Sequence, residues 1–225
     1  MKKLSVKAIV EFRGKSDRSK KAFVDNLVLD KKGPALEGGG DYWVTSLSSV
    51  SKSFKSNDLT WIVEKIDDLE EKLRASDFAI TKTMYKRNIS ILNNYKEFDF
   101  KKWRPLKNIT FLTKHKSNFI LKIKGLEVEV KPHHVFTFQN GSTTEVGAIW
   151  FIAKLNGFRK EELGMFTDIL YRYLKIHHSK NNVVNSKYCI AVDVFNSLDV
   201  NYRELETGKV TAVLDSCLDE IRKLM

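Results

Sequence analysis

The stretch from Asn118 to Phe195 constrains the fold of this chain more than any other part of the sequence. It opens with two strand-like segments, Phe119–Lys124 and Leu126–Phe138. At the start of the second segment apolar and charged residues alternate, which is the period of a half-buried strand. Gly125 supplies a turn between the segments, so the pattern predicts a β-hairpin.

A βαβ unit is predicted directly after this hairpin. Residues Val146–Leu155 are apolar on both faces, as expected of a central strand. An amphipathic helix is predicted over Lys160–His177, and a buried strand over Lys187–Phe195. Because a strand, a crossover helix and a second strand form a parallel pair, we predict a βββαβ core around a central mixed sheet.

The N-terminal part of the chain is predicted to be mainly helical. Residues Leu4–Phe12 are an exception, because their alternation predicts a strand, with Ile9 out of phase. Apolar residues recur at helical spacing in the segments 17–29, 41–55, 58–74, 81–95 and 210–224. The predicted fold class is α/β (α+β), with a helical N-terminal part, a mixed sheet and a C-terminal helix. Residues 1–105 and 106–225 form either two domains or one continuous domain.

Positive charge is concentrated in one segment. The formal net charge is +11, and residues 101–131 contain nine Lys or Arg against Glu127 and Glu129. A basic surface attracts polyanions, so a nucleic-acid partner is predicted, DNA more than RNA. A basic face that only aids solubility is the alternative. The cations assigned to the predicted surface are Lys101, Lys102, Arg104, Lys107, Lys114, Lys116, Lys122 and Lys124.

Aromatic residues are interleaved with these cations, a combination that can stack bases while binding phosphates. Trp103 is the aromatic residue assigned to the predicted nucleic-acid surface. If Trp103 is exposed, stacking on single-stranded bases gains support. If it is buried, the segment offers contacts to phosphates alone.

Membrane and disulfide-rich classes are disfavoured. No window approaches the roughly 18 apolar residues that a membrane span requires, and the N-terminus lacks the apolar segment of a secretory signal. Cys189 and Cys217 lie within apolar patterns and are predicted to be small buried residues. A cytoplasmic protein with no membrane partner is therefore predicted.

Helices, a three-strand meander, a helix and a fourth strand follow one another over residues 58–195, and this order resembles the PD-(D/E)XK nuclease superfamily. The resemblance implies a metal held by an acid on the second core strand and by an acid-x-lysine on the third. Carboxylates suit Mg²⁺ or Mn²⁺ because hard cations prefer oxygen ligands. Pro132-His133 and Ile152-Ala153-Lys154 occupy these positions, so the lysine matches while both acids are absent.

Other placements keep a working nuclease open. Glu129-Val130-Lys131 is a second acid-x-lysine, without an acid on the preceding strand. His133 is a candidate ligand for Zn²⁺ or Mn²⁺. Asp193 can equally be an aspartate that hydrogen-bonds a nearby turn. The candidate catalytic residues are Lys154, Asp193, Glu129, Lys131 and Glu145, with Asp168 as a further acid.

Three functions follow from these patterns. The leading one is a nucleic-acid-binding protein on a restriction-endonuclease-like scaffold with an altered or lost metal site, acting in DNA maintenance or defence. It would need no cofactor for binding. The alternative is an active Mg²⁺- or Mn²⁺-dependent nuclease with relocated acids. The third is a protein-protein interaction module whose N-terminal helices present an exposed apolar patch with Trp43 or Trp61.

Overall fold

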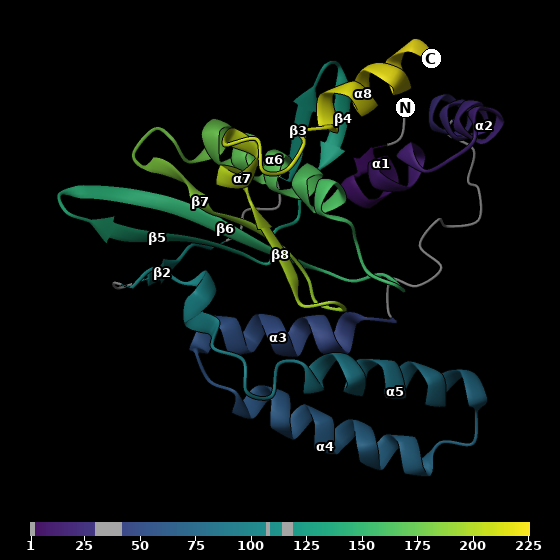
Figure 1. Ribbon diagram of the computed structural model, residues 1–225, viewed down its shortest axis with the longest axis vertical. Helices are drawn as coiled ribbons and strands as arrows, with labels where there is room; N and C mark the ends of the chain where they lie inside the picture. Colours follow the sequence, from purple (N-terminus) through teal and green to yellow (C-terminus); the bar gives the residue numbers. More distant parts are fainter. Residues whose placement is uncertain (1–2, 30–41, 107–108, 114–118) are drawn as a thin grey trace.

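Two helical layers cover the two faces of a central five-stranded sheet (Figure 1). The computed structural model describes residues 3–29, 42–106, 109–113 and 119–225. No helix within these ranges is long and apolar enough to cross a membrane. Each sheet face carries its own apolar cluster, so the sheet is buried on both sides.

The central sheet is mixed, as the sequence predicts. Its parallel pair is β6 and β7, which α6 (Lys160–His177) connects, and its other neighbouring strands are antiparallel. The α/β class with a βββαβ order is therefore confirmed. The strands in spatial order are β2 (Ile109–Phe111), β5 (His134–Asn140), β6 (Thr143–Ile152), β7 (Val183–Asp193) and β8 (Leu198–Asn201).

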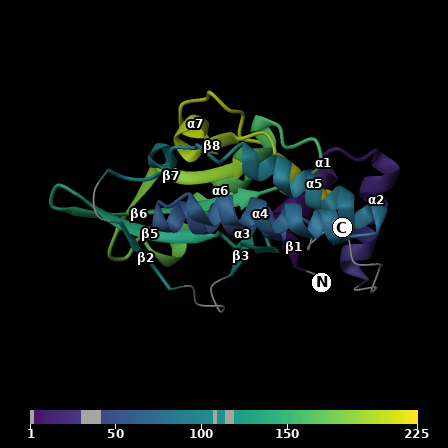
Figure 2. The same ribbon diagram turned by 90° about the horizontal axis from the view of Figure 1, so that it is seen from below.

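One helical layer comprises α3 (Val44–Ser56), α4 (Thr60–Ala75) and α5 (Ala79–Asn93), and Figure 2 shows it in front of the sheet. Val50 and Phe54 recur at i and i+4 on α3, and neither is exposed. The Phe54 ring lies 5.8 Å from the ring of Phe151 on β6, which anchors α3 to the sheet. The short helix η1 (Phe100–Trp103) then leads the chain into β2.

The opposite layer is built around α6 and includes a small three-stranded sheet of order β1-β4-β3. In this sheet β1 pairs in parallel with β4, so that Leu4 lies opposite Val128. The other elements of the layer are β1 (Leu4–Ser5), α1 (Val6–Arg13), α2 (Asp17–Val28), β3 (Ile120–Ile123), β4 (Leu126–Glu129), α7 (Tyr202–Glu206) and α8 (Leu214–Lys223).

The strand predicted over Leu4–Phe12 is wrong, because all but its first two residues belong to the helix α1. Ser5 caps this helix, and its hydroxyl accepts a hydrogen bond from the Ala8 N–H at 3.1 Å. Val6, Ile9 and Val10 are buried at helical spacing. Ile9, the residue out of phase with the strand pattern, therefore fits the helix.

The single strand predicted over Leu126–Phe138 is also wrong. The chain leaves the small sheet after β4 and enters the central sheet at β5, with Pro132 between the two. Pro132 has no N–H to donate to a strand ladder, so it suits a crossing between sheets. The hairpin β3–β4 thus belongs to the small sheet, and β2 supplies the first strand of the central meander.

Three helix predictions in the N-terminal part, over 17–29, 58–74 and 81–95, agree with α2, α4 and α5 to within two residues at each end. The helix predicted over 41–55 agrees with α3 except at its start, where Asp41 lies outside the described residues. The C-terminal helix is shorter than predicted, because α8 begins at Leu214.

Candidate nucleic-acid interface

The fold brings three sequence-predicted site residues to one edge of the central sheet. His133 precedes β5, Lys154 follows β6, and Asp193 ends β7. Since β5 runs antiparallel to β6, and β7 runs parallel to it, the start of β5 meets the ends of β6 and β7. We call His133, Lys154, Asp193 and the α6 residue Glu162 the strand-end cluster.

Asp193 in this cluster holds the loop that follows β6. Its side chain is not exposed, and its two carboxylate oxygens accept hydrogen bonds from the N–H of Phe158 at 2.9 Å and of Phe195 at 3.0 Å. Burial raises the pKa of the Asp193 carboxyl, and these hydrogen bonds oppose the rise. Gly157 permits the contact, because a Cβ atom there would lie 2.4 Å from the Asp193 Oδ2. The structure therefore gives Asp193 the turn-binding role.

Lys154 pairs with a carboxylate from α6. Its Nζ lies 2.9 Å from the Glu162 Oε2, and it also lies 4.5 Å over the ring of Phe158. Glu162 accepts a further hydrogen bond from the Arg159 N–H at 2.8 Å, as part of the capping box of α6. Burial acts to raise the pKa of the Glu162 carboxyl, but the bonds from Arg159 and Lys154 outweigh it, and the pKa is lowered.

Glu162 is a residue of the cluster that the sequence patterns do not single out. A signal is present, because an acidic residue at the third position of a predicted helix often completes a capping box. Its pairing with Lys154 is not predicted by any local pattern, because it depends on how the start of α6 lies against the end of β6. Its carboxylate is 9% exposed and already has three donors within 3.4 Å.

The other proposed metal and catalytic residues also have partners within the protein. His133 Nδ1 accepts a hydrogen bond from the Phe151 N–H at 3.2 Å. Glu145 lies at the opposite end of β6, where it accepts from Asn140 at 2.9 Å. Glu129 and Lys131 pair with each other at 2.7 Å. Within the described ranges no group of three or more His, Cys, Asp or Glu side chains is placed to hold a metal ion.

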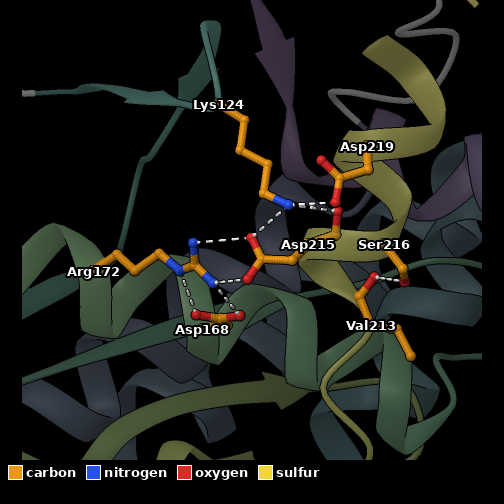
Figure 3. A network of polar contacts seen from close by, with 7 residues as sticks. All are labelled: Lys124, Asp168, Arg172, Val213, Asp215, Ser216 and Asp219. Atoms are coloured by element: carbon orange, nitrogen blue, oxygen red, sulfur yellow. Dashed lines mark hydrogen bonds and ion pairs between the residues drawn. The ribbon is translucent and has the colours of Figure 1, made fainter. Parts of the chain in front are cut away.

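Asp168 belongs to an ion-pair network between α6, α8 and the turn that follows β3 (Figure 3). Arg172 donates to Asp168 at 2.7 Å and to Asp215 at 2.9 Å. Lys124, a cation assigned to the predicted nucleic-acid surface, contacts Asp215 and Asp219. Burial raises the pKa of the Asp168 carboxyl, and Arg172 opposes the rise. This network ties the C-terminal helix to the core.

Two of the remaining cations of the predicted surface, Lys102 and Arg104, have partners within the protein. Lys102 pairs with Asp199 of β8, and Arg104 donates to the Phe54 carbonyl and, at 3.0 Å, to that of Lys55. Trp103 is 1% exposed, so its ring is not available to stack on a base. Lys101 and Lys122 are exposed, while Lys107, Lys114 and Lys116 lie outside the described residues.

A different surface combines cations with aromatic rings. Lys52 Nζ lies 5.0 Å over the ring of Trp61 on α4, and Lys55 Nζ lies 5.8 Å over the ring of Phe111 on β2. The Arg104 guanidinium lies 5.8 Å from the same Phe111 ring. Lys52 and Lys55 are three residues apart on α3, so they share one face of that helix. We call these five side chains the aromatic–cation row.

Two cations of the row have no acidic partner among the residues that the structure describes. Lys52 and Lys55 are exposed, and neither forms an ion pair with any residue that the structure describes. Arg104 is held in place by the carbonyl groups at the end of α3. Asp58 is the acidic residue that follows α3 in the chain, and its carboxylate accepts a hydrogen bond from the N–H of Thr60, the first residue of α4, at 3.0 Å. The row is therefore a basic surface with aromatic rings in fixed positions.

The sequence patterns indicate part of this row and miss the rest. Arg104 is among the predicted cations, and Trp61 is predicted as part of a surface for a protein partner. Lys52 and Lys55 are missed, although their spacing on the polar side of a predicted helix is visible in the sequence. No protein-family model, curated protein or solved structure matches the chain.

Proposed function

We propose that the protein binds nucleic acid through the aromatic–cation row. The observation that carries the proposal is the pair of exposed lysines, Lys52 and Lys55, which lie next to aromatic rings and form no ion pair with any residue that the structure describes. Phosphate groups are the natural counter-ions for such lysines, and the net charge of +11 attracts a polyanion from a distance. DNA is the first substrate to test, with RNA beside it.

The scaffold of the proposed binding protein resembles the PD-(D/E)XK superfamily in its order of elements, with an altered or lost metal site. Asp193 and Glu162 occupy the strand-end edge, but their oxygens accept hydrogen bonds from neighbouring backbone and side chains. These contacts favour a role in the fold. Binding to phosphates at the row needs no cofactor, and a context in DNA maintenance or defence is compatible with it.

A Mg²⁺- or Mn²⁺-dependent nuclease is the second candidate, because Lys154, Glu162 and Asp193 lie at the same sheet edge. Such a nuclease would have to release both carboxylates from their present hydrogen bonds before they could hold a metal. Incubation of the protein with DNA and RNA in Mg²⁺, Mn²⁺ or EDTA distinguishes the two candidates. Metal-dependent cleavage that Lys154→Ala removes would favour the nuclease.

The binding proposal is tested by fluorescence anisotropy over a series of salt concentrations. The variant Lys52→Gln/Lys55→Gln should weaken binding and lower the slope of log K against log salt by roughly 0.9 for each duplex phosphate that is no longer neutralised. The matched control is Lys7→Gln/Lys21→Gln, which removes the same charge from exposed positions on α1 and α2. Equal effects of the two variants would show that net charge acts alone, and the row would not be the interface.

A further inference from the structure

Trp61 has an unusual position among the four tryptophans of the chain, all of which the structure describes. Its exposed fraction is 43%, whereas Trp43 and Trp103 are buried at 8% and 1%. Trp150 is half-buried and packs against Phe166 of α6. What distinguishes this exposed ring is the cation beside it, because aromatic rings and cations together suit nucleic-acid strands.

The backbone beneath Trp61 is fixed. Trp61 is the second residue of α4, and its neighbour Ile62 is fully buried in the core between the helices and the sheet. The Ile62 N–H donates to the Leu59 carbonyl at 2.9 Å, which closes the first turn of the helix. An exposed ring on a fixed backbone can receive a flat ligand with little loss of conformational freedom.

The surroundings of Trp61 indicate the charge of that ligand. Lys52 lies over the ring, and Lys55 follows on the same face of α3. An ammonium group on a four-carbon stem can move from the ring to a nearby phosphate. An apolar protein partner would instead have to bury these two charges, which is unfavourable. A flat, anionic ligand therefore fits the surface best.

We infer that Trp61 stacks on an unpaired base, so that the aromatic–cation row takes single-stranded nucleic acid in preference to duplex. This inference rests on the proposed function. In a duplex the base faces are stacked on one another, so a protein reaches the phosphates, the sugars and the base edges but not the faces of the bases. In a single strand each base offers a free face to an aromatic side chain. Lys52, Lys55 and Arg104 can bind the phosphates of a single strand or of a duplex, whereas Trp61 can stack only on a base of a single strand.

The test measures the affinity of oligodeoxythymidylate, alone and annealed to oligodeoxyadenylate, for four forms of the full chain. These are the wild type, Trp61→Ala, Trp61→Phe and Phe78→Ala. We expect Trp61→Ala to weaken single-strand binding by roughly 5- to 150-fold, the range that loss of one stacked base implies, with duplex binding within about twofold. Trp61→Phe should restore much of the loss, since a phenyl ring still stacks. Phe78→Ala is the matched control, because Phe78 is a 75% exposed aromatic residue at the start of α5.

The outcomes distinguish a failure of this inference from a failure of the proposed function. If the wild type binds neither the single strand nor the duplex, this inference and the proposed function are both wrong. If the wild type binds and Trp61→Ala lowers neither affinity, or lowers both equally, the stacking role of Trp61 is overturned while nucleic-acid binding stands. Intrinsic fluorescence gives a second readout: a stacked base should quench the wild type on binding, and the quenching should be largely absent in Trp61→Phe.

Discussion

Lys154 and Lys52 are both lysines beside an aromatic ring, yet their electrostatic situations are opposite. Lys154 lies over Phe158, and its ammonium group pairs with Glu162 at 2.9 Å. Lys52 lies over Trp61 and forms no ion pair with any residue that the structure describes. A compensated charge stabilises the fold, whereas an uncompensated charge at the surface is available to an external anion. On the proposed function, the strand-end cluster stabilises the fold, and the aromatic–cation row is left to bind an anion.

The largest effect on stability is expected from removing a cation that pairs with a buried acid. Arg172→Ala leaves Asp168, whose side chain is 7% exposed, without its partner (Figure 3). We expect the free energy of unfolding to fall by about 3 kcal/mol, because an unpaired buried charge is costly. Urea denaturation measures the loss. Arg222→Ala, at an exposed position on α8, is the control and should cost less than about 0.5 kcal/mol. Equal stabilities of the two variants would contradict the assigned role of the network.

Asp193→Ala tests the cluster itself. The substitution leaves the N–H groups of Phe158 and Phe195 without their acceptor inside the protein. We expect a loss of about 2 to 3 kcal/mol in the free energy of unfolding, as for unsatisfied buried donors. Folded variant protein should keep the nucleic-acid affinity of the wild type in an anisotropy assay. Unchanged stability together with lost metal-dependent cleavage would reverse the comparison and place catalysis at the cluster.

Glu162→Gln should have a smaller effect that depends on pH. The pKa of the Glu162 carboxyl is lowered in the folded protein, because the bonds from Arg159 and Lys154 together outweigh the opposing effect of burial. The carboxylate therefore contributes stability that is complete above its unfolded pKa of about 4.3 and is lost as the pH falls through the folded value. We expect the variant to lose about 1 kcal/mol at neutral pH. The difference from the wild type should shrink at low pH.

Urea denaturation at neutral and acidic pH measures this effect. Glu161→Gln is the matched control, since it removes the preceding carboxylate of the same helical turn, which forms no ion pair with any described residue. A constant difference between Glu162→Gln and the wild type at every pH would mean that the ionised carboxylate is not the source of the stability.

The sequence is sufficient for the centre of the fold because its signals there are local. The apolar strand β6, the long amphipathic helix α6 and the apolar strand β7 each exceed the usual minimum length of their class. The prediction fails at Leu4–Phe12, where Val6 and Val10 lie on one face in both a strand and a helix. In that segment the cap at Ser5 and the burial of Ile9 decide for the helix.

The candidate sites and the charged segment before them are less predictable, because their contacts depend on how the elements pack and not on local patterns. The charge of the segment around Lys102 is visible in the sequence, but its partner Asp199 lies 97 residues later. Trp103 is assigned to the predicted nucleic-acid surface with its exposure left open, and the fold buries it among Tyr95, Phe98 and Phe151. The contact between Lys52 and Trp61 depends on the angle between α3 and α4, which no local pattern specifies.

The parallel pairing of β1 with β4 has a consequence for synthesis of the chain. Leu4 lies opposite Val128, so the first strand cannot pair until the residues from Ser5 to Val128 have followed it out of the ribosome. At typical translation rates this delay is roughly 6 to 25 s. Val6, Ile9 and Val10 of α1 wait longer still, because α1 packs against α6 and α8, which follow β4 in the chain. The period in which these apolar side chains are open to aggregation therefore extends beyond the emergence of β4.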